Sequence, residues 1–330
     1  MTTLITGGAG FVGLAVAEQL LARGDRIVLF DLHRLPASAA TAFAALPGRF
    51  EAVTGDVAEP GAIQAVVAAH GVRRLLHAAA ITADANRDAR EPVRIATVNL
   101  IGTLRALEAA RDGGVARYVH ASTGALFGPA GIGVARPLDE ERDRPDPQSL
   151  YGITKFAAER ACLRLASLWR LDVRIGRLAQ VYGRWEHPSG ERDTLSLPCQ
   201  LTAVALRGGE AVIPQAGPQD WIYAPDVAAA LIALLDAGPS ERALYHLGNE
   251  APFAVEAWCE RLAARFPAFR WRFAAAGEAP NVTALSPQPR TAFSSRRLRA
   301  DTGWAPRFPI DAAFADYMTW IEAGGAGLIA

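Results

Sequence analysis

The sequence predicts an α/β protein with a doubly wound parallel sheet, followed by a smaller C-terminal α/β lobe. Three observations support this fold class. In the first half of the chain, short β-branched runs alternate with longer runs rich in Ala and Leu, which is typical of alternating strands and helices. A glycine-rich turn at 6–13 joins the first strand-like run to the first helical run. After about residue 182 the alternation becomes irregular, and Pro, Gly, Arg and Trp become frequent, which indicates a second lobe.

The period of the apolar residues places the individual elements. Strands are predicted at 3–6, 26–31, 50–54, 74–79, 117–122, 172–178 and 243–247, and helices at 11–23, 60–70, 93–111, 151–170, 226–236 and 311–323. Strands that alternate with helices at this spacing form βαβ units with right-handed crossovers, so the sheet is parallel. We expect residues 1–182 to form a nucleotide-binding domain that carries the catalytic residues. Residues 183–330 should form mainly a substrate lobe, from which about 220–248 returns to the first domain.

The composition is that of a globular protein, with 51% hydrophobic and 21% charged residues among 330. Lys+Arg and Asp+Glu both number 34, so no basic excess exists for a nucleic-acid backbone or a membrane surface. Cys162, Cys199 and Cys259 fit neither a disulfide framework nor a metal site. His187 has no other potential ligand at metal-binding spacing. We therefore expect no metal, no signal peptide and no transmembrane helix, and a cytoplasmic protein.

Gly7, Gly10 and Gly13 follow the spacing G-x-x-G-x-x-G between a predicted strand and a predicted helix. Gly7 allows the tight turn, Gly10 lets the backbone approach a pyrophosphate, and Gly13 lets the helix pack closely. The free N–H groups at the start of the helix, at Phe11 and Val12, would bind the phosphates. A glycine-rich turn alone is only a connection, but this context predicts a Rossmann-type dinucleotide site.

Two acidic residues follow the next two strands. Asp31 lies about twenty residues after the glycines, where a carboxylate binds the adenosine ribose and repels a 2′-phosphate, which favours NAD over NADP. Arg34 is close enough to hold such a phosphate instead. Asp56, with Val57, follows the third strand, and its carboxylate either accepts a hydrogen bond from the adenine amino group or caps the next helix.

Tyr151 and Lys155 stand four residues apart at the start of a predicted helix, so they share one helical face. A neighbouring cation stabilises the phenolate, which can then take a proton from a substrate hydroxyl while hydride leaves to a nicotinamide. Lys155 would also hold the nicotinamide ribose. An isolated Tyr-x-x-x-Lys is usually a surface pair, but after a dinucleotide-binding half it indicates a catalytic site.

These motifs resemble, in their order and approximate spacing, the extended short-chain dehydrogenase/reductases, the NAD-dependent epimerase/dehydratase family. The resemblance rests on 6–13, 77–80, 99–103, 122–128 and 151–155, and it continues through 177–183, 220–227 and 294–304. It implies that a set of further residues lines the cofactor or fixes the helices around it, namely Ala78, Ala79, Ala80, Asn99 and Ser122. It implies that Thr123 binds the substrate oxygen that changes oxidation state. It also implies a homodimer that packs the helices at 93–111 and 151–170 together.

Departures from the family's patterns help to choose among its activities. Dehydratases of the family carry an Asp-Glu pair after the catalytic Thr, where this chain has Gly124 and Ala125, so dehydration is not expected. Nucleotide-sugar epimerases carry an Arg where this chain has Gln219, an Asn near Gln180, and an Arg-x-Gly-Asp step that is missing around Arg290, although Arg290 itself could serve. The contacts expected for a sugar diphosphate are therefore weakened.

The loop after residue 182 offers Arg184 and Arg192, either of which could hold a substrate carboxylate, although each alone is more often a solvated surface residue. Our first hypothesis is therefore an NAD-dependent oxidoreductase acting on a secondary hydroxyl of a sugar, sugar acid or related polyol, with Tyr151 as the base. The alternative is a nucleotide-sugar 4-epimerase of the UDP-sugar type that uses the same Tyr151, Lys155 and Thr123. A third hypothesis is a non-catalytic NAD-binding protein, against which the intact site argues.

Overall fold

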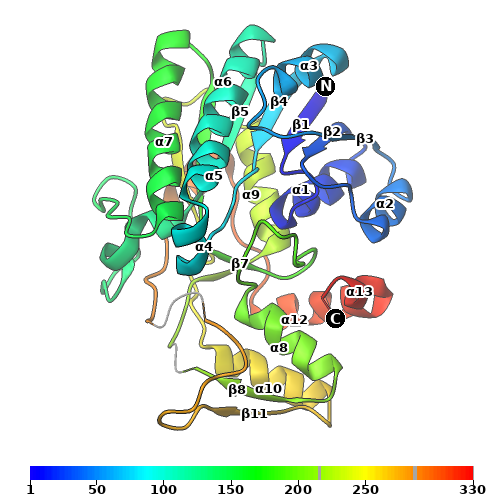
Figure 1. The fold of residues 1–330 in the computed structure, drawn as a ribbon, viewed down its shortest axis with the longest axis vertical. Helices are drawn as coiled ribbons and strands as arrows, with labels where there is room; N and C mark the ends of the chain where they lie inside the picture. Colours follow the sequence, from blue (N-terminus) through cyan, green and yellow to red (C-terminus); the bar gives the residue numbers. More distant parts are fainter. Residues whose placement is uncertain (215–216, 285–287, 330) are drawn as a thin grey trace.

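The centre of the molecule is a parallel sheet of seven strands (Figure 1). The computed structural model describes residues 1–214, 217–284 and 288–329. The strands of this sheet are β1 (Thr2–Thr6), β2 (Arg26–Asp31), β3 (Arg49–Thr54), β4 (Val72–His77), β5 (Arg117–Thr123), β6 (Val173–Leu178) and β10 (Leu244–Leu247). Their order is β10-β6-β5-β4-β1-β2-β3, and every neighbouring pair is parallel. From β1 the chain adds β2 and β3 toward one edge of the sheet, and from β4 onward it adds strands toward the other edge. This change in strand order between β1 and β4 opens a crevice at the carboxyl ends of these two strands.

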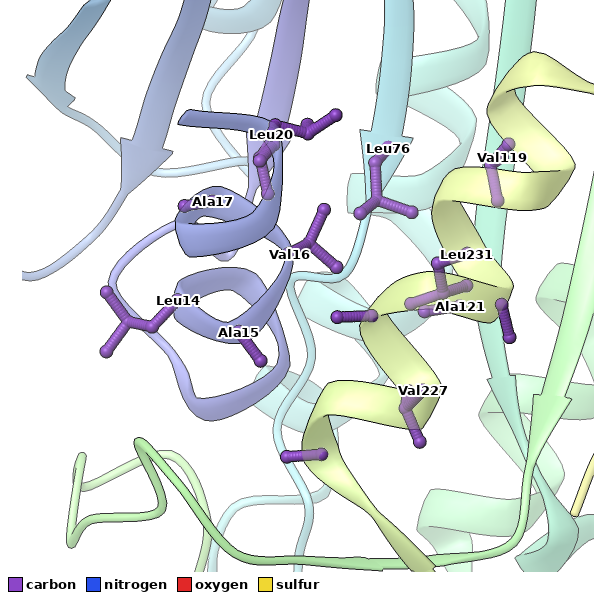
Figure 2. Close-up of a cluster of buried hydrophobic side chains, with 14 of the residues drawn as sticks. Leu14, Ala15, Val16, Ala17, Leu20, Leu76, Val119, Ala121, Val227 and Leu231 are labelled. Carbon is purple, nitrogen blue, oxygen red and sulfur yellow. The ribbon is translucent and has the colours of Figure 1, made fainter. Parts of the chain in front are cut away.

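Helices cover both faces of this sheet, which confirms the predicted doubly wound fold. One face carries α1 (Phe11–Ala22), α2 (Ala37–Ala44) and α9 (Ala224–Asp236), and the other carries α3 (Ala62–His70), α6 (Gly102–Asp112) and α7 (Leu150–Trp169). Successive strand side chains point to opposite faces, so Ile5 packs with α1 while Leu4 packs with α3 and α6. In Figure 2, Val16 on α1 and Leu231 on α9 meet over Leu76 of the sheet.

The second lobe has its own apolar core around Trp221, Trp258 and Tyr317. Its elements are β7 (Gln180–Tyr182), α8 (Leu197–Leu206), β8 (Glu210–Ile213), β9 (Trp221–Tyr223), α10 (Val255–Arg265), β11 (Arg270–Phe273), α12 (Ile310–Trp320), a π-helical turn η3 (Ile321–Gly325) and α13 (Ala326–Ile329). The helix α11 (Arg296–Thr302) packs instead on α9 and β10 of the first lobe. Between β9 and α10 the chain leaves this lobe, forms α9 against α1 and adds β10 to the sheet edge. The two lobes are therefore joined by several crossings of the chain.

The predicted elements of the first half lie within two residues of the observed ones, with one exception. The single helix expected at 93–111 is three segments, namely α5 (Pro92–Ala96), the π-helical turn η1 (Thr97–Ile101) and α6. The hydroxyl of Thr103, near the start of α6, donates to the carbonyl of Asn99 in the turn at 2.7 Å, a bond that competes with regular helical pairing. The prediction also missed α2, α4 (Ala85–Arg90), the 3₁₀ segment η2 (Gly124–Gly131) and most of the second lobe. Among the described residues no helix is long and apolar enough to span a membrane.

Candidate active site

The crevice at the carboxyl ends of the strands widens into a cavity of about 1180 Å³ between the two lobes. Nearly all the residues predicted from the sequence to form the site line this cavity: Gly7, Gly10, Phe11, Val12, Gly13, Asp31, Asp56, Val57, Ala78, Ala79, Ala80, Ser122, Thr123, Tyr151, Lys155, Gln180, Arg192 and Arg290. Asn99 and Arg184 do not line it. The fold thus brings together residues from both halves of the chain in one space.

The glycine-rich turn has the shape that a pyrophosphate requires. Gly7 adopts a φ of 71°, and a Cβ there would lie 2.6 Å from the Ala79 backbone nitrogen. A Cβ at Gly13 would lie 2.0 Å from the Gly7 carbonyl oxygen, so only glycine lets α1 pack against the turn. Gly10, the N-cap of α1, provides no side-chain cap. The first N–H groups of α1 therefore face the cavity and are available to phosphate oxygens.

The segment after β2 forms one end of the cavity, which we call the adenosine end because the sequence predicts the adenosine there. Asp31 accepts hydrogen bonds from the backbone N–H groups of Ala9 and His33, each at 2.9 Å, and this fixes its carboxylate at the cavity edge. Leu32 is 41% exposed and offers the apolar surface that a purine base needs. Asp56 lines the cavity and accepts from Ala58 N at 2.8 Å, which closes a turn after β3, but it does not cap the next helix, whose N-cap is Gly61.

Asn99 does not line the cavity, so it is not a cofactor-lining residue, but it does fix the helices around the site, as the resemblance implies. Its side chain is fully buried, accepts from Ile81 N at 2.8 Å, and donates to Ile81 O and Thr154 Oγ1. These bonds tie the segment after β4 to the first turns of α7. The physical reason is the π-helical turn η1, which lies against α7 and directs Asn99 toward that helix.

Tyr151 and Lys155 project into the cavity from the first two turns of α7. The Ser149 hydroxyl caps this helix by accepting from Gly152 N at 3.1 Å, and Asp88 accepts from Leu150 N at 2.9 Å. A capped and tethered helix start holds the tyrosine and the lysine on one face, one turn apart. The sequence-predicted pair is therefore placed on a rigid element beside the cofactor turn.

Lys155 is the only lysine in the chain, which otherwise uses 33 arginines. Its side chain is 2% exposed, and its Nζ donates to Ala121 O at 2.6 Å and lies 3.3 Å from His120 Nε2. Burial lowers the pKa of Lys155 from 10.5 to about 8, against the opposing influence of Cys162 and Glu159. Arginine stays charged in proteins and has a wide planar head, so this position needs a compact cation. The presence of one lysine among 33 arginines is therefore a further sequence signal for a functional role of Lys155.

Thr123 ends β5 at the cavity wall, where its Oγ1 accepts from Ala125 N at 3.1 Å. The preceding Ser122 donates to Glu159 at 3.1 Å, and Glu159 forms a buried ion pair with Arg177 of β6. This network fixes the end of β5 relative to α7, and hence the threonine relative to the Tyr/Lys pair.

His77, the last residue of β4, is a core residue. It is fully buried, with Nδ1 2.7 Å from Thr6 Oγ1 and Nε2 3.1 Å from Thr103 Oγ1. Burial lowers its pKa to about 3, so its ring is neutral. It stacks on His120 with ring centroids 5.6 Å apart, which supports the histidine beside Lys155.

On the substrate side, Arg290 and Gln180 face the cavity with unused polar atoms. Within the described ranges the Arg290 guanidinium has no ion pair or hydrogen bond, and burial lowers its pKa. The buried Oε1 of Gln180 likewise has no partner among those residues. A partly buried guanidinium without a protein partner favours an anionic ligand, whereas the buried Oε1 of Gln180 needs a hydrogen-bond donor such as a hydroxyl.

Arg184 does not line the cavity, which corrects the expectation that it could hold a substrate carboxylate. Its guanidinium pairs with Glu18 of α1 and with Asp316 of α12, the latter at 3.5 Å, and so joins the two lobes behind the cavity. The sequence could not separate Arg184 from Arg192, because the loop between them folds back and only Arg192 reaches the cavity. Within the described ranges, no three His, Cys, Asp or Glu side chains form a cluster that could hold a metal ion.

The family of the protein follows from its sequence as well as from this site. Residues 3–248 match the model of the NAD dependent epimerase/dehydratase family, and the chain belongs to that family. The resemblance noted from the motifs is thus confirmed. NAD, the predicted cofactor, is confirmed with it, and the uncapped helix start and the carboxylate of Asp31 are suited to hold it.

Relatives that carry the names of enzymes match most of the chain. A dTDP-L-rhamnose 4-epimerase of Burkholderia thailandensis is 27% identical, over 96% of this chain and 94% of its own length. A UDP-glucose 4-epimerase of Mycolicibacterium smegmatis is 31% identical, over 70% of this chain and 72% of its own. Among solved structures, the Thermus thermophilus UDP-glucose 4-epimerase in complex with NAD has a TM-score of 0.79 and 25% identity, covering 98% of this chain and 100% of its own.

Proposed function

We propose that the protein is a nucleotide-sugar 4-epimerase, which oxidises a secondary hydroxyl and then reduces the ketone from the opposite face. The observation that carries this proposal is the single cavity of about 1180 Å³, which joins the cofactor turn, Tyr151 and Arg290. Cavities for one drug-sized ligand measure roughly 300–1000 Å³, so this cavity has room for a dinucleotide and a second large ligand. The 4-epimerase relatives support the proposal. It reverses the order of our two hypotheses, because the comparisons favour the alternative over a sugar dehydrogenase.

The residues of the site would divide the chemistry as follows. Tyr151 takes the proton of the sugar hydroxyl, and the Lys155 ammonium, held by Ala121 O, stabilises the negative charge that develops. Thr123 orients the reacting oxygen. Bound NAD supplies a reversible acceptor for the hydride. Epimerisation then requires the keto sugar to turn within the cavity before Tyr151 returns the proton.

Arg290 and Gln180 would hold the diphosphate that stays fixed while the sugar turns. A guanidinium pairs well with phosphate oxygens, and a desolvated one without a protein partner gains most from an anionic ligand. Gln219, which replaces the arginine common in such epimerases, donates to Gln288 O at 2.9 Å and so supports the segment that leads to Arg290. The diphosphate would therefore be held with one arginine fewer.

Dehydration is opposed by the structure around Gly124. A Cβ at this position would lie 2.8 Å from the ring of Phe293, so the acidic side chain that a dehydratase carries there would not fit. The neighbouring Ala125 offers no proton donor or acceptor. Without these acids, elimination of water has no side chain at this place to move the proton.

We also propose a homodimer that forms through the helices on one side of the molecule. Four large apolar side chains are exposed there: Val93 at the start of α5, Ile101 in η1, and Ile153 and Leu168 on α7. They make up most of the strongly exposed large apolar side chains of the described chain. Exposed apolar groups on adjacent helices are typical of a surface that a partner covers.

The test uses UDP- and dTDP-hexoses that carry deuterium at C4, with products identified by NMR. An epimerase gives the 4-epimer with its deuterium retained and without NADH accumulating, because the hydride removed is the one returned. The second candidate, a sugar-acid dehydrogenase, is favoured by the loss of the arginine at Gln219, since a single carboxylate needs fewer cations. It would give stoichiometric NADH with free sugar acids and no epimer, and that result would refute the proposal.

A further inference from the structure

Residues 187–194, which we call the strap, cross the cavity between its adenosine end and its catalytic end. His187, Pro188, Ser189, Glu191, Arg192 and Thr194 of the strap line the same cavity as the glycine-rich turn. The backbone is paired to the segment after β4, since Thr82 N donates to Glu191 O at 2.8 Å and Asp193 N donates to Thr82 O at 3.2 Å. The strap is therefore held to the segment after β4 by backbone hydrogen bonds, and it lies along the cavity that would hold the cofactor.

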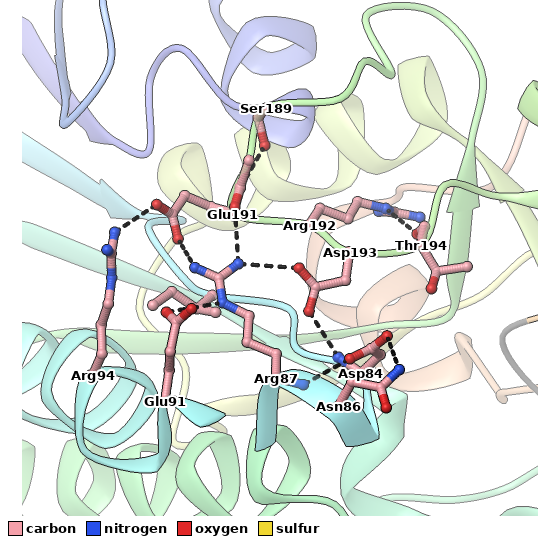
Figure 3. Close-up of polar contacts among 12 residues, drawn as sticks. Asp84, Asn86, Arg87, Glu91, Arg94, Ser189, Glu191, Arg192, Asp193 and Thr194 are labelled. Carbon is pink, nitrogen blue, oxygen red and sulfur yellow. Dashed lines mark hydrogen bonds and ion pairs between the residues drawn. The ribbon is translucent and has the colours of Figure 1, made fainter. Parts of the chain in front are cut away.

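The side chain of Arg87, on α4, fastens the strap (Figure 3). Its Nη1 donates to Gly190 O at 2.8 Å and to Asp193 at 3.1 Å, and its Nη2 donates to Glu191 at 2.9 Å. The arginine side chain is only 7% exposed, so these charge-assisted bonds are shielded from solvent. Because one guanidinium makes three contacts with residues 190–193, Arg87 is the main attachment of the strap to the first lobe.

Glu191 contacts two further side chains that line the cavity. Its Oε1 accepts from Arg94 at 2.7 Å, and it lies 3.6 Å from the ring of His33, two residues after Asp31. Glu91, by contrast, contacts Arg87 at 3.4 Å and, within the part of the chain that the structure describes, makes no hydrogen bond or ion pair with the strap. The carboxylate of Glu191 therefore joins the strap to His33 at the adenosine end and to Arg94 on α5, whereas the nearby carboxylate of Glu91 does not.

Arg192 places a positive charge over the start of α1. Its guanidinium carbon lies 5.4 Å from the centre of the Phe11 ring, and the fully buried Glu186 holds Nη2 at 3.1 Å while Nε donates to Thr194 O. Its Nη1 has no hydrogen-bond partner among the described residues. The guanidinium thus lies on the strap side of the helix N-terminus that receives the pyrophosphate.

We propose that the strap closes the cofactor cavity and keeps NAD from exchanging, with Arg192 binding the cofactor pyrophosphate opposite the glycine-rich turn. The dinucleotide is then held between two sets of donors, the N–H groups of α1 and the guanidinium of the strap. Release requires the bonds of Arg87 and Glu191 to break together, because both fasten the same few residues. The inference concerns the cofactor and stands whether the substrate is a nucleotide sugar or a sugar acid.

The first experiment measures how fast bound NAD exchanges with added deuterium-labelled NAD, by mass spectrometry of the protein-bound pool. Glu191→Gln removes the charge that Arg87, Arg94 and His33 share, and exchange is expected to be on the order of tenfold to a hundredfold faster. Glu91→Gln is the matched control and should exchange at the wild-type rate. Equal rates for wild type and Glu191→Gln, or for Glu191→Gln and Glu91→Gln, would overturn the role of the strap.

The second experiment tests Arg192 by NAD titration calorimetry at several salt concentrations. Because Arg192→Gln alone would leave Glu186 buried and unpaired, the test variant combines Arg192→Gln with Glu186→Gln, and Glu186→Gln alone is the control. The double variant should bind NAD about tenfold more weakly than the control and with a shallower salt dependence. Equal affinity and salt dependence of the two variants would show that Arg192 does not contact the pyrophosphate.

Discussion

Lys155 should titrate near pH 8 in the cofactor-free protein, because its burial between α7, to which it belongs, and β5 disfavours its charged form. Burial lowers the pKa from 10.5 to about 8. Since the chain has no other lysine, protein labelled with [¹³Cε]lysine gives a single resonance, whose chemical shift against pH reports this group alone. The same protein in denaturant provides the reference and should titrate near the ordinary lysine value.

The same shift predicts a change in stability with pH. Below pH 8 the lysine is charged in both the folded and the unfolded protein. Burying the ammonium then costs about 3 kcal/mol, which is the free energy that corresponds to the lowering of its pKa from 10.5 to about 8. Between pH 8 and 10.5 only the unfolded chain holds the proton, so the free energy of unfolding rises with pH. Above 10.5 the cost is absent. Wild type should therefore gain about 3 kcal/mol relative to Lys155→Met between pH 7.5 and 10.5.

Urea unfolding of both proteins across this range measures the difference, and groups common to both cancel in it. The absolute stability of Lys155→Met is less informative, because the variant also leaves Ala121 O without its donor. A lysine resonance with a midpoint at 10 or above, or a stability difference that does not change with pH, would refute the reasoning. It would mean that the ammonium is solvated or paired more strongly than its contacts show.

Three further predictions test the site and the assembly. Tyr151→Phe should lower turnover by at least about a hundredfold while the protein still binds NAD, since a positioned base contributes roughly 10²–10⁴-fold; turnover within a few fold of wild type would contradict its role. Gly13→Ala places a Cβ 2.0 Å from Gly7 O, and relief of such a clash costs about 1–3 kcal/mol, so NAD should bind about 5- to 150-fold more weakly by calorimetry. Gly238→Ala, where a Cβ meets nothing within 4 Å, is its control. Leu168→Glu adds a charge to a side chain that is 55% exposed on α7 and should yield monomers by light scattering; an unchanged mass would place the interface elsewhere.

Local sequence determined the cofactor turn, the Tyr/Lys pair and the alternation of strands and helices. The reason is that the constraints on these features are short-range. A turn that a Cβ would fill needs glycine at fixed spacing, and two side chains on one helical face need a spacing of four. The boundaries of β2 were predicted to the residue, because an apolar run bounded by charged and turn residues marks both ends of a strand.

Other features depended on contacts between distant parts of the chain. Asn99 could be placed near the site, but its actual partners, Ile81 and Thr154, are 18 and 55 residues away, and the π-helical turn that aims it breaks the expected helix. Arg184 and Arg192 look alike in one polar loop. Only the fold gives the first to Glu18 and Asp316 and leaves the second facing the cavity.

The sequence by itself thus determined the class of fold, the cofactor and the residues proposed for the reacting centre, because each is encoded in a few neighbouring positions. The tertiary structure decided which of the remaining charges face the cavity and which hold the molecule together. A charged side chain in a loop finds its partner through long-range packing, and its spacing in the sequence carries no record of that partner. The attachment of the strap to Arg87, across about a hundred residues of chain, is of this second kind.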